Sequence, residues 1–169
     1  MGSHVIDAPG TILKTALAVG AAALTGRWAA NPGSAWYRRL RKPPWQPPER
    51  AFGLVWTPLY ALIVYGGARA SAHGDDGQRA ALSRALAANL LFNAAWPVLF
   101  FRLRAPRLAL AELLALNASN LVLIRRALAA DRPAGLLLTP YAGWTVFATA
   151  LNASLWRRNR TTPAATGGD

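Results

Sequence analysis

The 169-residue chain contains no cysteine, and it is poor in lysine, histidine and acidic residues. Without cysteine there is neither a disulfide framework nor a thiolate metal site. The two histidines, His4 and His73, stand apart, and Glu112 is the only carboxylate inside a long apolar segment. The sequence therefore offers no acid–base dyad, no nucleophile–histidine pair and no metal cluster. We expect no metal site, no required cofactor and no conventional catalytic constellation.

Apolar sequence is abundant, with 53% hydrophobic residues. Charge is absent, or limited to Glu112, in four long segments: 51–68, 85–101, 108–124 and 134–156. Each is close to the roughly 20 apolar residues that a helix needs to span a bilayer. A fifth segment, 11–30, is weaker because it is alanine-rich and carries Lys14 and Arg27 near its ends, where long cationic side chains can reach the interface.

These segments predict an all-α membrane protein, a five-transmembrane-helix bundle with a Trp/Pro-rich capping loop between the first two helices. The predicted helices cover about 11–30, 51–69, 80–101, 107–125 and 134–157, within a single domain over 11–157. We interpret residues 1–10 as a tag remnant with an N-terminal tail, and 158–169 as a flexible C-terminal tail.

The formal net charge is +12, but the basic residues lie between the apolar segments rather than along one soluble face. This distribution argues against nucleic-acid binding. Alternate loops carry 12 of the 19 cationic residues, in 27–50, in 102–107 and after 156. The positive-inside rule then predicts an N-terminus outside and a C-terminus in the cytoplasm. The many arginines and alanines favour a bacterial cell membrane.

The segment 36–48 reads Trp-Tyr-Arg-Arg-Leu-Arg-Lys-Pro-Pro-Trp-Gln-Pro-Pro. Its four prolines prevent a continuous helix, because each lacks an amide hydrogen and favours extended geometry in the residue before it. One interpretation is an interfacial anchor, since Trp, Tyr, Lys and Arg collect at the lipid headgroups. The alternative is a lid over a pocket.

Three predicted helices carry stripes that combine aromatic and amide side chains. Members of each stripe are three or four residues apart and so share a helix face. The stripes are Trp56 and Tyr60; Asn89, Asn93, Trp96 and Phe100; and Tyr141, Trp144, Ala148 and Asn152. Aromatic stripes are usually core packing, and asparagines can join helices by hydrogen bonds. Under a Trp-rich loop, they also fit a pocket for a flat apolar ligand.

An intramembrane carboxylate marks either an internal pairing or a functional site. For Glu112 we favour pairing with an arginine of the 102–107 turn, which the preceding helix places nearby. Ligand chemistry is the second interpretation, and the sequence leaves its charge state open.

Four motifs together resemble one family. They are Trp-Tyr-x-x-Leu-x-Lys-Pro-x-Trp-x-Pro-Pro at 36–48, Trp-Thr-x-Leu-Tyr at 56–60, Asn-x-x-x-Asn-x-x-Trp-x-x-x-Phe-Phe at 89–101 and Pro-Tyr-x-x-Trp-x-x-Phe-Ala-x-x-Leu-Asn at 140–152. In order and spacing they resemble the TspO/MBR family, the tryptophan-rich sensory proteins, translocator proteins and peripheral-type benzodiazepine receptors. The resemblance covers nearly the whole chain.

The resemblance implies a five-helix fold, commonly a homodimer, that binds porphyrins, haem-type tetrapyrroles, sterols and benzodiazepine-site ligands. Some bacterial relatives degrade protoporphyrin in light and oxygen, a role that would fall here to Trp56 and Trp144. The sterol motif of animal members lacks its tyrosine in 151–157, which lowers the expectation of sterol binding. The predicted ligand-binding residues are Trp36, Arg38, Arg41, Lys42, Trp45, Trp56, Tyr60, Asn89, Asn93, Trp96, Tyr141, Trp144, Phe147, Ala148 and Asn152.

The leading hypothesis is a membrane receptor or sensor that binds porphyrin or haem inside the bundle and regulates tetrapyrrole or stress responses. Under this hypothesis, the cationic side chains of the cap bind the propionate groups of the porphyrin, and the tryptophans stack on its ring. The alternatives are a light- and oxygen-dependent porphyrin-degrading enzyme, and a transporter of porphyrins or sterols. The usual inverted repeat and charge relay of transporters are missing from the sequence.

Overall fold

A computed structural model describes residues 8–160, and within that range every regular element is a helix. In chain order the elements are α1 (Ala8–Ala29), α2 (Ala35–Arg39), α3 (Glu49–His73), α4 (Asp76–Pro97), the π-helical turn η1 (Val98–Arg102), α5 (Pro106–Ala130), α6 (Arg132–Leu137) and α7 (Thr139–Asn159). The all-helical prediction is confirmed. The predicted tails lie mostly outside the described residues; α1 already begins at Ala8 and α7 continues to Asn159.

Four segments are long and apolar enough to cross a membrane: Glu49–His73, Asp76–Arg102, Pro106–Ala130 and Arg132–Asn159. At 1.5 Å per residue, 25 helical residues reach beyond the ~30 Å of a bilayer's hydrocarbon core. Their outward surfaces carry exposed leucines such as Leu54, Leu91 and Leu114, whereas buried positions include several amides. This pattern of apolar residues outside and paired polar residues inside is typical of a protein that lies in lipid.

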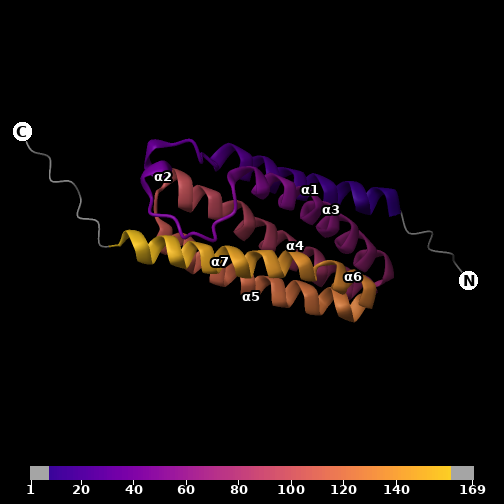
Figure 1. The fold of residues 1–169 in the computed structure, drawn as a ribbon. Coiled ribbons are helices and arrows are strands. Elements are labelled where there is room, and N and C mark those ends of the chain that lie inside the picture. The colour runs from indigo at the N-terminus through magenta and orange to yellow at the C-terminus, as the bar shows by residue number, and fades with distance from the viewer. Residues whose placement is uncertain (1–7, 161–169) are drawn as a thin grey trace, which may run out of the picture.

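The long helices run up and down beside one another, and the two ends of the described chain lie at opposite ends of the bundle (Figure 1). α4 packs against α5, α5 packs against α7, and α1 packs against both α3 and α4. The segment between α1 and α3 crosses one end of the bundle and reaches α7 (Figure 1).

The arginine-rich connections all lie at that same end. The Arg102 guanidinium donates to the Trp28 carbonyl at 2.6 Å, which joins the end of η1 to the end of α1. The Asn152 amide donates to the Pro106 carbonyl at 2.7 Å, so the start of α5 meets the last turns of α7. The structure thus gathers at one end the connections that the charge analysis assigned to one side of the membrane.

Local sequence explains where the helices start and break. Asp75 caps α4 in a capping box with Gln78, which satisfies two otherwise free amides. Pro97 is followed by the π-helical turn η1, the local distortion that this proline predicts. The predicted single helix over 134–157 is divided at Leu138 into α6 and α7, because Pro140 cannot donate the amide hydrogen bond that a continuous helix needs there.

Glycine is needed where α6 folds back onto α5. A Cβ built on Gly135 would lie 2.4 Å from Leu128 Cγ and 2.8 Å from its backbone nitrogen. Any larger residue at this position would push α6 away from α5. Gly135 therefore allows α6 to pack closely on α5 just before the chain enters α7.

Candidate functional site

The capping segment is held to the bundle through Tyr37. This ring is 5% exposed and lies against Phe101 and Phe100, with ring centroids 5.3 and 6.2 Å away. Gln46 Nε2 donates to the Tyr37 hydroxyl at 3.0 Å. Burial raises the pKa of Tyr37 although the hydrogen bond from Gln46 acts in the opposite direction, so the phenol stays neutral at the base of the cap. The predicted extended cap therefore contains one short helix, α2, with Tyr37 at its centre.

Two of the predicted cationic ligand residues are occupied inside the cap itself. Lys42 Nζ donates to the Tyr37 carbonyl at 2.8 Å and lies 4.6 Å from the centre of the Tyr37 ring. Arg38 donates to the carbonyl of Gly33. Both cationic side chains therefore bind backbone carbonyl groups at the cap. They could bind a ligand only if these hydrogen bonds were broken and the cap rearranged.

The far side of the cap is tied to α7 by an amide clamp. Asn159 Oδ1 accepts from the Arg41 backbone N–H at 2.9 Å, and Asn159 Nδ2 donates to the Arg41 carbonyl at 3.2 Å. The Arg41 guanidinium is exposed and makes no hydrogen bond within residues 8–160. Arg41 therefore combines a backbone fixed by Asn159 with a side chain that is free in the part of the chain described.

Seven aromatic side chains from the cap, α3 and α7 form two groups of paired rings, one helical turn apart on α3 and α7, which together we call the aromatic wall. Its members are Trp45, Phe52, Trp56, Tyr60, Tyr141, Trp144 and Phe147. Trp144 stacks on Phe147 at 5.1 Å and meets the edge of Phe52 at 5.9 Å. Trp45 of the cap meets the edge of Phe147 at 5.9 Å, so the wall runs from the cap into the bundle.

Deeper in the bundle, Trp56 is the centre of the second group of the wall, which among the described residues has no ring pair with the first group. Its ring stacks on Tyr60 at 5.1 Å and lies 6.2 Å from Tyr141 on α7. α3 and α7 approach each other closely at few positions, so these rings supply much of the contact between the two helices. Trp56 and Trp144 are only partly buried, and both pack against the main hydrophobic core together with Ala148. A flat ligand could enter such an interface by displacing ring-to-ring contacts, because few close backbone contacts between α3 and α7 would be lost.

The other predicted aromatics belong to a second group at the end of α4. Trp96 stacks on Phe100 at 5.2 Å, and Trp36 meets the edge of Phe100 at 5.5 Å. Trp96 Nε1 also donates to Asn152 Oδ1 at 3.2 Å. This group packs α2 and the cap onto η1, and among the described residues it has no ring pair with the aromatic wall.

The asparagine stripe lies in a buried hydrogen-bond network between α4, α5 and α7. Asn89 Nδ2 donates to Asn120 Oδ1 at 2.7 Å, and Asn120 Nδ2 donates to Thr145 Oγ1 at 2.7 Å. Asn89 Oδ1 accepts from the Tyr141 hydroxyl at 3.0 Å. Asn89, Asn120 and Thr145 are at most 1% exposed. Buried amides that satisfy one another in this way join helices, which is the structural interpretation of the stripe.

One chain of hydrogen bonds connects this network with the aromatic wall. Tyr60 donates its hydroxyl hydrogen to Asn93 Oδ1 at 3.2 Å, and Asn93 Nδ2 donates to the Tyr141 hydroxyl at 3.2 Å. Tyr60 and Tyr141 therefore carry both roles, with rings in the wall and hydroxyls in the network.

Glu112 has a different environment from the predicted one. Both carboxylate oxygens are inaccessible to solvent and have no hydrogen-bond partner among the described residues. The ion pairs in that part of the chain are Arg69 with Asp131 and Arg79 with Asp76, so the favoured pairing with the 102–107 turn is not seen.

Sequence reasoning missed several members of these groups, among them Phe52 and Thr145. Phe52 lies four residues before Trp56, which in turn lies four before Tyr60, so helical spacing could have added it to the α3 stripe. Thr145 gives no such signal, because a threonine within an apolar helix satisfies its hydroxyl on its own backbone as readily as on a neighbour.

Comparison with known proteins places these features in context. The model of the TspO/MBR family matches residues 14–157. A tryptophan-rich sensory protein of Cereibacter sphaeroides is 35% identical over 148 residues, which cover 88% of this chain and 90% of the relative. The translocator protein of Homo sapiens is 33% identical over 135 residues, 79% of this chain and 80% of the relative. A TspO protein of Archaeoglobus fulgidus is 33% identical over 152 residues, 88% and 96% of the two chains.

Proposed function

Because the chain belongs to the TspO/MBR family of membrane proteins, we propose that it is a receptor that binds porphyrins or related flat tetrapyrroles between α3 and α7. The observation that carries this proposal is the aromatic wall, whose first group of rings runs from Trp45 in the cap to Trp144 and Phe52, and whose second group holds Trp56 and Tyr141 one turn deeper on the same two helices.

Stacking and burial would supply most of the affinity. Aromatic pairs contribute about 0.5–1.5 kcal/mol each beyond the area they bury, and a tetrapyrrole can contact several rings at once. The exposed Arg41 guanidinium at the rim could meet a propionate, a geometry that suits a planar guanidinium. Trp36, Trp96, Asn89 and Asn152 then have a supporting role, since they fix the cap and α4 behind the wall.

In this proposal α1 is a fifth membrane span, and the basic end of the bundle faces the cytoplasm. α1 is 22 residues long and has Thr15, Val19 and Ala22 buried against the bundle. Leu13, Leu17 and Leu24 are 60–68% exposed. This outward apolar face suits lipid or, in a homodimer, a second copy of the chain.

The test is a titration of detergent-purified protein with protoporphyrin IX, followed by tryptophan fluorescence and porphyrin absorbance, in the dark and then under light. Saturable quenching with a stable porphyrin spectrum supports a receptor. Saturable quenching followed by protein-dependent, light-dependent loss of the porphyrin would make the protein an enzyme. Absence of saturable quenching would refute the proposed ligand class.

A further inference from the structure

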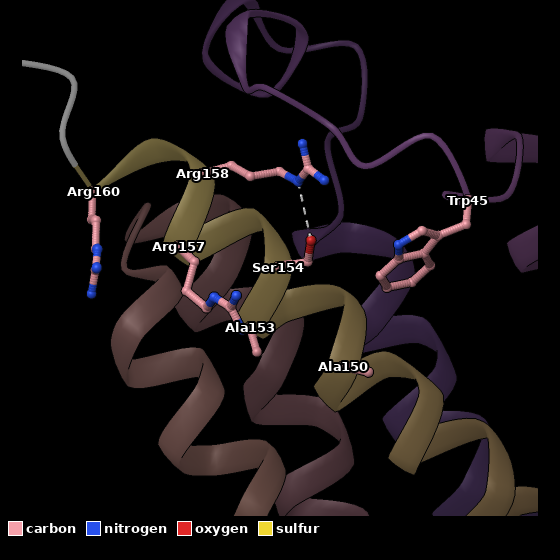
Figure 2. Close-up of a pocket in the computed structure, with 7 residues that line it drawn as sticks. All are labelled: Trp45, Ala150, Ala153, Ser154, Arg157, Arg158 and Arg160. Carbon is pink, nitrogen blue, oxygen red and sulfur yellow. Dashed lines mark hydrogen bonds between the residues drawn. The ribbon is translucent and has the colours of Figure 1, made fainter.

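A hollow lies outside the bundle, on the outer side of the last three turns of α7. Its volume is about 620 Å³, and it is lined by Trp45, Ala150, Ala153, Ser154, Arg157, Arg158 and Arg160 (Figure 2). It shares only Trp45 with the aromatic wall, so a ligand here would occupy space distinct from the proposed porphyrin site.

The upper rim of this hollow is strongly basic and well supplied with hydrogen-bond donors. Arg158 Nε donates to Ser154 Oγ at 3.3 Å, which directs the guanidinium across the rim (Figure 2). Arg157 extends beside Ala153 on the other side of the helix ridge (Figure 2). Within residues 8–160, neither the Arg157 nor the Arg160 side chain has an ion pair or hydrogen bond, and no lining residue is acidic.

The lower part of the hollow is apolar. Ala150 and Ala153 leave a shallow floor on α7, and the Trp45 ring faces it across the hollow (Figure 2). Trp45 is 47% exposed, and a half-exposed tryptophan beside arginines is characteristic of the membrane–water interface. A basic rim above an apolar floor matches a ligand that has an anionic head and an apolar body.

We propose that this hollow binds the phosphate headgroup of an anionic membrane phospholipid, with an acyl chain lying over Ala150 and Ala153. Guanidinium groups are suited to phosphate because their paired N–H groups match its oxygens. Cations at a helix C-terminus also complement its partial negative charge. Arginines that only stabilise the end of α7 in this way would give the protein no preference for anionic over neutral lipid. A preference for anionic lipid would therefore indicate a headgroup site.

The experiment uses the full chain purified in a neutral detergent and native mass spectrometry to count retained lipids. Phosphatidylglycerol and phosphatidylcholine with identical acyl chains are offered at equal concentrations. We expect the protein to retain phosphatidylglycerol in preference, and the double variant Arg157→Gln/Arg158→Gln to weaken its retention by about thirtyfold, as expected for losing two charged contacts at a membrane surface.

The matched control is Arg125→Gln/Arg126→Gln, which removes an adjacent, exposed pair near the end of α5, at the opposite end of the bundle. This variant has the same change in net charge and should retain phosphatidylglycerol as the wild type does. Helix content and melting temperature, measured by circular dichroism, confirm that both variants fold, independently of any porphyrin binding.

Three results would overturn the proposal: equal retention of the two lipids, equal losses in the two double variants, or unchanged retention in Arg157→Gln/Arg158→Gln. A further arm adds inorganic phosphate against chloride of equal ionic strength. Persistence of the lipid supports a headgroup site, whereas its displacement by phosphate alone would assign the hollow to a soluble anion and overturn the lipid assignment.

Discussion

The two sides of α7 are built in different ways. Toward α5, Thr145 lies in a buried network with Asn117 and Asn120. Toward α3, the same helix presents Tyr141, Trp144 and Phe147, which meet Phe52, Trp56 and the cap through ring contacts. One side joins helices by directional hydrogen bonds, and the other by stacked and edge-on rings.

This difference has a mechanical consequence. A hydrogen bond in a buried network is lost if its partners move apart by an ångström or two, and an unpaired amide in an apolar interior is costly. Ring contacts are less directional, and a flat ligand can replace one ring face by another. We therefore expect the α5 side to stay fixed while the α3 side opens around a ligand.

The largest expected effect is on the fixed side. Asn89→Leu would leave the Asn120 amide oxygen without its donor and the Tyr141 hydroxyl hydrogen without its acceptor, so we expect the free energy of unfolding to fall by about 2 kcal/mol. Thermal or denaturant unfolding in detergent measures this. Asn31→Leu changes an exposed asparagine and should have little effect. An Asn89→Leu protein as stable as the wild type would show that the network does not hold α4 to α5.

On the adaptable side, the expected effect is on binding rather than stability. Trp144→Leu removes the stack on Phe147 and the edge contact with Phe52, and we expect protoporphyrin affinity to fall by about tenfold, or about 1.4 kcal/mol. The measurement is the quenching titration. Trp28→Leu changes a 65% exposed tryptophan on α1 and serves as the control. Unchanged affinity in Trp144→Leu, or an equal loss in Trp28→Leu, would contradict a specific role of the wall in binding.

Glu112 on α5 contrasts with the paired amides of the buried network, because its carboxyl group has no hydrogen-bond partner among the described residues. Glu112→Met replaces the unpaired carboxyl with an apolar side chain of similar length, and we expect stability to rise by about 1 kcal/mol. Glu112→Gln keeps the shape without an ionisable group and isolates the contribution of charge. A less stable Met variant would reveal a hydrogen-bonding role for this carboxyl.

The smallest effect on stability is expected for the ion pair between Arg69, near the end of α3, and Asp131. Asp131 accepts hydrogen bonds from Arg69 Nε at 2.6 Å and from the Ala134 N–H at 2.9 Å, and the hydrogen bond from Arg69 holds the pKa of Asp131 below its usual range. A carboxylate with a lowered pKa stabilises the fold fully above its unfolded pKa, and the contribution is lost as pH falls through the folded value.

The wild type should therefore melt above Asp131→Asn at neutral pH, and the gap should close below about pH 4. Asp76→Asn, in an exposed pair with Arg79, should shift the melting temperature much less. A gap that persists in acid would show that the carboxylate's charge contributes nothing.

The helices could be predicted from the sequence because lipid requires long apolar segments, and the predicted spans differ from the helices by a few residues at their ends. The division between α6 and α7 was not predicted. Its signals, Gly135 and Pro140, look like ordinary residues within a transmembrane helix, where neighbouring helices satisfy a freed carbonyl.

The site was predictable only in part. Spacing brought Trp56, Tyr60, Tyr141 and Trp144 to shared faces. In the structure Trp56 pairs with Tyr60 and Tyr141, whereas Trp144 pairs with Phe52 and Phe147. Spacing could not decide whether Asn89 bonds a ligand or Asn120, because that depends on how α4 and α5 are rotated against each other. Nor could it show that Lys42 folds back onto the Tyr37 carbonyl, a contact within an irregular loop.

The most direct test of the difference between the two sides is a pair of distances measured by electron paramagnetic resonance. The chain has no cysteine, so spin labels can be placed uniquely on exposed positions: Leu54→Cys with Val146→Cys across α3 and α7, and Leu114→Cys with Val146→Cys across α5 and α7. On saturation with protoporphyrin IX, we expect the α3–α7 distance to lengthen by about 3.5 Å, the contact thickness of one aromatic ring, and the α5–α7 distance to stay constant. Saturable binding with the α3–α7 distance unchanged, or with the α5–α7 distance lengthened instead, would contradict the account.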